Sequence, residues 1–146
     1  MRTTYLLSLL SIFLFISLES CKYEEGPAIS LRTKKSRVVN DWFLYEIITT
    51  EASTGKKEVE TISYKEDEYV MHSYSKNGDY TTTDKYGGKT YTKSYRWEFT
   101  DKKKKLKHIY QNGETESAEI LKLKNDEMWL KVIDDYFEYE LHFREF

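Results

Sequence analysis

The 146-residue sequence is short of the residues that mark covalent or fibrous scaffolds. It contains one cysteine, one proline and six glycines. A single cysteine cannot form an internal disulfide or a cysteine-based zinc site. So few prolines and glycines exclude a collagen-like chain and argue against a disordered, proline-rich linker. A chain of this length accommodates one domain rather than two.

The sequence also lacks an excess of charge of either sign. The 23 Lys and Arg residues nearly balance the 25 Asp and Glu residues, which leaves a net charge of −2. A nucleic-acid-binding domain normally concentrates basic residues on one face, so we predict no nucleic-acid partner. Aromatic side chains are plentiful instead: 13 Tyr, 7 Phe and 3 Trp are enough to form the core of a small domain.

The one long apolar run, residues 5–18, is too short to span a membrane. It has 14 residues, where a spanning helix needs roughly 20, but this length suits the central part of a secretory signal. Arg2 precedes the run, and Leu18-Glu19-Ser20-Cys21 ends it. These four residues resemble the lipobox of bacterial lipoproteins, except that Glu19 replaces the usual small residue.

The lipobox resemblance implies that the chain is a membrane-anchored lipoprotein. We predict that residues 1–20 are a signal peptide and that Cys21 becomes the acylated first residue, carrying fatty acids such as palmitate. Residues 21–29 then comprise the lipidated cysteine and its tether. The resemblance places the protein at the bacterial outer membrane or cell surface, with the periplasmic face as the alternative.

Two charged segments follow the cysteine, and each allows two interpretations. Glu24 and Glu25 resemble an export signal for surface display, but they also suit a solvated spacer. Residues 29–39 are predicted as the only helix, with Ser30 as its N-terminal cap and Asn40 as its stop. The basic side of this helix either attracts anionic lipid head groups or is simply solvated.

From residue 42 onward the pattern is of strands separated by turns. Apolar and polar residues alternate with a period of two, most clearly over residues 90–100, and Asn77-Gly78 is the strongest signal for a two-residue hairpin turn. No segment between strands is long enough for a crossover helix, so we predict an antiparallel up-and-down meander of about eight or nine strands, closed into a barrel. The predicted strands are residues 42–50, 57–64, 68–75, 79–85, 90–100, 106–110, 115–124, 128–133 and 136–146.

Three stretches resemble lipocalin-like lipoproteins of Gram-negative bacteria. They are Ser-Leu-Arg-Thr-Lys-Lys at 30–35, Arg-Val-Val-Asn-Asp-Trp at 37–42, and Ala-Glu-Ile-Leu-Lys-Leu-Lys-Asn-Asp-Glu-Met-Trp-Leu at 118–130. The resemblance implies an all-β, lipocalin-like (calycin-type) barrel over residues 30–146. In lipocalins a Gly-x-Trp motif opens the first strand, and its Trp closes one end of the barrel. Trp42 matches that Trp, whereas Asn40 replaces the Gly. Asparagine is able to adopt positive φ, which would keep the turn, and the geometry at this position stays open.

No catalytic or metal-binding constellation stands out in the sequence. His72, His108 and His142 fall on three different predicted strands without the spacing of a metal site. Carboxylate pairs lie in the tether or in turns, and the lysines at 102–105 suit a solvated loop. We therefore predict a non-enzymatic protein with no catalytic residue, metal or cofactor.

One feature favours a binding site. Tyr91, Lys93, Tyr95, Trp97 and Phe99 share one face of a predicted strand, where they form either the wall of a ligand pocket or part of a packed core. With Trp42, they are our candidate ligand-binding residues. The leading prediction is a barrel that binds a small apolar or amphipathic molecule. The alternative is a non-enzymatic interaction or inhibitor module that docks a protein partner at the cell envelope.

Overall fold

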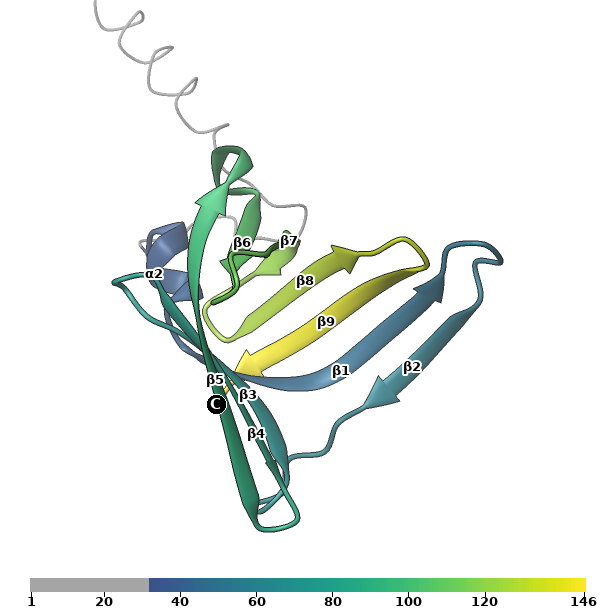
Figure 1. The fold of residues 1–146 in the computed structure, drawn as a ribbon, viewed down its shortest axis with the longest axis horizontal. Coiled ribbons are helices and arrows are strands. Elements are labelled where there is room, and N and C mark those ends of the chain that lie inside the picture. Colours follow the sequence, from purple (N-terminus) through teal and green to yellow (C-terminus); the bar gives the residue numbers. More distant parts are fainter. Residues whose placement is uncertain (1–31) are drawn as a thin grey trace, which may run out of the picture.

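The structure, a computed structural model, describes residues 32–146 (Figure 1). The predicted signal peptide, Cys21 and the tether lie outside this range. The elements are α2 (Lys34–Val38), β1 (Asp41–Glu51), β2 (Lys57–Thr61), β3 (Tyr69–Tyr74), β4 (Asp79–Tyr86), β5 (Lys89–Thr100), the short 3-10 turn η1 (Asp101–Lys103), β6 (Lys105–Ile109), β7 (Thr115–Leu123), β8 (Glu127–Ile133) and β9 (Phe137–Glu145).

The strands form a closed antiparallel barrel, which confirms the predicted fold class. From β3 to β9 each strand pairs with the next along the chain, and β9 pairs with β1 to close a ring of eight strands. The ninth strand, β2, is an extra strand that pairs only with β1. All nine predicted strands are present, and their ends differ from the predicted ones by a few residues at most.

The barrel is narrow at one end and splayed at the other. Residues 41–43 of β1 pair with β3, whereas residues 46–50 pair with β2, so β3 leaves β1 after only three residue pairs. Figure 1 shows the result: β3, β4 and the first half of β5 diverge from β8, β9, β1 and β2. The connection from β2 to β3 bridges the gap between these two arms.

The core fills the narrow end. Trp42 is fully buried there, and its Nε1 donates a hydrogen bond to the carbonyl of Val38 at 2.9 Å, which ties the helix to the first strand. The side chains with no exposed surface come from the helix and from five strands: Val38, Trp42, Leu106, Ala118, Leu123, Met128 and Phe143. Large aromatic and aliphatic side chains therefore pack this end of the barrel solid.

The helix differs from the predicted one. Within the described residues it covers only Lys34–Val38, and its N-terminal cap is Thr33, whose hydroxyl accepts from the Ser36 amide at 3.1 Å, rather than Ser30. Its basic side is not simply solvated either, since Lys34 and Arg37 are 9% and 6% exposed. The helix lies across the barrel end, so positions that a free helix would expose become covered.

Asn40 occupies the position where the lipocalin motif has glycine, and the structure decides its geometry. Its φ is not in the left-handed region, so the turn is not kept through positive φ. Its side chain acts instead: Oδ1 accepts from the Asp41 amide at 3.0 Å, and Nδ2 donates to Glu145 Oε1 at 3.0 Å. The Asn40 carbonyl also accepts from the Tyr74 amide. Asn40 thus links the start of β1 to the ends of β3 and β9.

Two further local predictions are corrected by the structure. At Asn77-Gly78 only Gly78 has positive φ, at +92°, so the connection is not a two-residue turn; Ser75 and Asp79 close it through a hydrogen bond. In β7 the pairing with β8 shifts register between Ile120 and Lys122. The sequence pattern predicts Ala118, Ile120 and Lys122 on one face and Leu123 on the other. This β-bulge reverses the end of that alternation, because Leu123 joins the core and Lys122 lies on the outer face beside Trp129.

Candidate functional site

The predicted stripe on β5 faces the barrel interior and runs from the core to the open mouth. Trp97 lies opposite His108 of β6, and Tyr95 lies opposite Tyr80 of β4. Trp97 is only 5% exposed, whereas Tyr91, six residues earlier, is 54% exposed. The stripe therefore belongs to both of the predicted environments, a packed core at one end and an open wall at the other.

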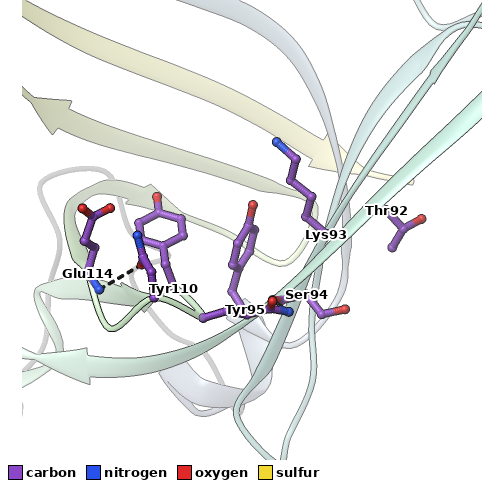
Figure 2. A pocket seen from close by; sticks show the side chains of 8 residues that line it. Thr92, Lys93, Ser94, Tyr95, Tyr110 and Glu114 are labelled. Atoms are coloured by element: carbon purple, nitrogen blue, oxygen red, sulfur yellow. Dashed lines mark hydrogen bonds between the residues drawn. The ribbon is translucent and has the colours of Figure 1, made fainter.

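A groove of about 560 Å³ lies beside the stripe where β5 extends past its neighbour. β6 pairs with β5 only over residues 96–100 of β5, so residues 92–95 face open space next to the β6–β7 turn. In Figure 2 the side chains of Lys93, Tyr95 and Tyr110 extend to the same side, whereas Thr92 and Ser94 point elsewhere. The lining residues are Thr92, Lys93, Ser94, Tyr95, Tyr110, Gln111, Asn112 and Glu114.

The structure brings only part of the predicted site together. Lys93 and Tyr95 line the groove, whereas Trp42, Tyr91, Trp97 and Phe99 do not. Trp97 belongs to the core, with its Nε1 donating to the Ser75 carbonyl at 3.1 Å and its ring 5.4 Å from that of Phe99. Sequence reasoning missed Tyr110, whose ring meets Tyr95 edge-on at 4.9 Å.

A buried network of histidines and tyrosines lies beneath the groove. The Tyr74 hydroxyl is 3.0 Å from His108 Nε2, and His108 Nδ1 is 3.2 Å from Glu116 Oε1. The Tyr80 hydroxyl is 2.7 Å from His72 Nδ1, and the Tyr80 ring stacks on those of Tyr74 and His108 at 4.6 and 4.5 Å. These contacts satisfy polar atoms that would otherwise be costly to bury.

The environment of this network fixes its protonation. Hydrogen bonding to His108 holds the pKa of Glu116 below its usual range, so Glu116 is a carboxylate at neutral pH. Burial raises the pKa of Tyr110 to about 12, with the nearby Glu116 carboxylate adding to the effect. Burial also raises the pKa of Tyr74 and Tyr80. The tyrosines therefore remain neutral hydrogen-bond donors over the whole physiological range.

A second group of aromatic side chains lies outside the barrel, and we call it the outer aromatic patch. It consists of Phe43, Tyr64, Tyr69 and Phe146. Tyr64 is at its centre, with ring centroids 5.6 to 5.8 Å from those of the other three, and Tyr64 and Phe146 are 47% and 55% exposed. A groove of about 320 Å³ opens beside the patch.

The histidines do not converge on a common site. His72 and His108 face the interior, whereas His142 lies on the outer face, stacked on Trp129 at 4.1 Å and bonded to Glu46 and Glu140. Among residues 32–146, no group of three or more His, Cys, Asp or Glu side chains is placed to hold a metal ion. The same part of the chain contains no helix long and apolar enough to cross a membrane.

No protein-family model matches this chain, and no curated protein is significantly similar to it in sequence.

Proposed function

We propose that this chain is a lipid-anchored, lipocalin-like lipoprotein of the bacterial envelope that binds a small apolar or amphipathic molecule. The observation that carries the proposal is the groove at the barrel mouth, where two tyrosine rings and a lysine face the same open space. Concave sites lined by aromatic rings and a few polar groups are the usual form of small-molecule sites. An eight-stranded barrel is also about the size that holds one such ligand.

The groove side chains suggest how a ligand would lie. The rings of Tyr95 and Tyr110 offer apolar contact surface, and their hydroxyls can orient a polar group. The exposed ammonium group of Lys93 favours an acidic or strongly polar head on the mouth side. Because the groove is open and the core below it is packed, the ligand is only partly covered, and we expect binding in the micromolar range.

Two single substitutions on neighbouring residues of β5 test ligand binding. Tyr95→Ala removes a groove wall and should weaken binding of an apolar dye or a fatty acid several-fold. Arg96→Ala is the matched control, since Arg96 points to the outer face near Asp79 and should leave affinity within about twofold. Titrations followed by dye fluorescence and by tryptophan emission give the affinities. Equal affinities for the parent and both variants would contradict a site at this groove.

The anchor is tested separately at Cys21, which lies outside the described residues. Cys21→Ser should move the protein out of the membrane fraction and abolish labelling by a fatty-acid probe, because the sequence offers no other cysteine for acylation. Labelling that persists in this variant would refute the lipoprotein assignment. It would leave the ligand-binding proposal standing, because the groove contains no part of the predicted anchor.

The outer aromatic patch supports a second candidate, an interaction module that docks a protein partner. Exposed aromatic side chains next to a groove are typical of protein-binding surfaces, where they provide most of the affinity. Here Tyr64 and Phe146 retain half of their surface exposed although they pack against buried Phe43. This candidate becomes the better-supported function if the parent protein binds none of a broad panel of lipids and dyes.

A further inference from the structure

The first half of β5 has an edge with no strand beside it in the described part of the chain. Residues 89–96 pair with β4 on one side, but β6 covers the other side only from Arg96 to Thr100. The Trp97 amide donates to Gly78 on the β4 side, so the amides and carbonyls of the odd-numbered residues point toward β4. Those of Thr90, Thr92 and Ser94 consequently point to the open edge.

This edge has few of the features that normally block strand pairing. Its pairing with β4 runs from residue 89 to residue 96 without a bulge, and it contains no proline. Residues 89–94 are all exposed. Among residues 32–146, the Gln111 side chain occupies part of this edge, where its Nε2 donates to the Ser94 carbonyl at 3.3 Å. A straight, exposed edge of this kind is a template for another strand.

We propose that β5 pairs antiparallel with β5 of a second copy, about a two-fold axis at Thr92. In this register Thr92 faces Thr92 of the other copy, and Thr90 faces Ser94, so all outward-pointing backbone groups meet a partner. On the interior face Tyr91 of one copy lies opposite Lys93 of the other in this register. Each cationic side chain thus lies beside an aromatic ring, an attractive cross-strand pair that occurs twice in the dimer.

The lysines select this register over its neighbours. A two-fold axis keeps the odd-numbered residues on one face in both copies. Each alternative register therefore places the axis at another residue of β5 and never between two residues. An axis at Tyr91 places Lys89 opposite Lys93, and an axis at Lys93 places Lys93 opposite itself. Like charges directly opposite each other destabilise a sheet. Lysine on an exposed edge usually prevents pairing altogether, but of these three neighbouring registers the axis at Thr92 alone avoids opposing lysines.

The dimer goes beyond the proposed ligand-binding function and does not depend on it. The partner strand would lie along Thr92 and Ser94, which also line the groove, and would displace the Gln111 amide from the Ser94 carbonyl. Pairing between β5 strands therefore predicts competition with any molecule held between residues 92 and 95. A monomeric protein that binds the dye would overturn the dimer alone, and a dimer that binds nothing would overturn the ligand alone.

Opposite charges introduced at Tyr91 provide the first test. Tyr91→Glu places a carboxylate opposite Lys93 and should lower the dimer dissociation constant by roughly 3- to 30-fold, whereas Tyr91→Lys should raise it by a similar factor. Tyr91 is 54% exposed, but it lies opposite Asp84 of β4, so urea unfolding of both variants is measured alongside to confirm that the fold is kept. Sedimentation of the full chain in mild detergent gives the constants. Two variants that change dimerisation in the same direction would overturn the register, because a side chain opposite Lys93 must respond to the sign of its own charge.

Cysteine cross-linking provides the second test and remains informative if the dimer is weak. In the Cys21→Ser background, Thr92→Cys places two thiols opposite each other at a Cα separation suited to a disulfide. Thr90→Cys is the matched control, since its two copies would lie about 13 Å apart. A mixture of Thr90→Cys and Ser94→Cys should cross-link again. The proposal is overturned if Thr92→Cys forms disulfide dimers no faster than Thr90→Cys at about 100 µM protein.

Discussion

At the scale of single residues, His72 makes the folded state sensitive to acid. Its pKa is lowered from an ordinary value of 6.5 to about 3, mainly by burial. The neighbouring His108 also lowers this pKa, and the Glu116 carboxylate raises it by a smaller amount. Nδ1 of the neutral ring can accept a hydrogen bond from the Tyr80 hydroxyl, and the ring packs 4.8 Å from Phe143. Protonating this ring would remove the acceptor and place a charge in the interior.

The sign of the pH dependence follows from these two pKa values. Between pH 6.5 and about 3 the unfolded chain binds one more proton at His72 than the folded chain does, so stability falls as the pH falls. Between pH 7 and pH 5 we expect a loss of about 2 kcal/mol in the free energy of unfolding. His72→Gln keeps an acceptor for Tyr80 without the titrating ring, so its stability should change much less over this interval. Urea unfolding at both pH values measures the difference. Parallel pH profiles for the parent and the variant would show that His72 is not the responsible group.

At the scale of the elements, sequence reasoning located the strands and failed where a neighbour decides the local structure. A period of two identifies a half-buried strand from its own residues, which is why the shared face of Tyr91 to Phe99 on β5 was predicted correctly. The bulge at residue 121 depends on the register between β7 and β8, and the sequence of β7 alone does not predict it. The helix cap and the Asn40 contacts likewise depend on the barrel end that the helix covers.

The candidate site was also predicted only in part, because some of its residues depend on how the strands pair. Lys93 and Tyr95 were found because they share a face with an aromatic stripe on one strand. Tyr110 and Glu114 belong to the site only because β6 ends beside the middle of β5, and this offset is a property of the pairing rather than of either strand. The depth of Trp97 was not predictable either, since it depends on what closes the barrel below it. Residue type and period therefore identify the strand face that lines the site, but not the part of that face at which the groove lies.

At the scale of the whole molecule, packing is concentrated at one end. The narrow end combines Trp42, Met128 and Phe143, all with no exposed surface, whereas every residue of β2 at the splayed end is exposed. The open edge of β5 lies in the arm that diverges from the other strands (Figure 1), and residues 92–95 of this edge line the groove. A binding mouth on weakly packed strands can adapt to a guest or to a partner strand while the packed end preserves the fold.

This asymmetry predicts a gradient of local stability, which hydrogen exchange can measure. Amides of β1, β8 and β9 around Trp42 and Phe143 should exchange only through global unfolding, because opening them exposes the core. Amides of β2 are hydrogen-bonded to β1 but cover no buried side chains, so fraying releases them at little cost. We expect their protection factors to be at least about 100-fold lower at neutral pH. Uniform protection across β2 and β1 would contradict this gradient, because it would mean that β2 unfolds only together with the core. The ligand would then bind to a rigid barrel mouth.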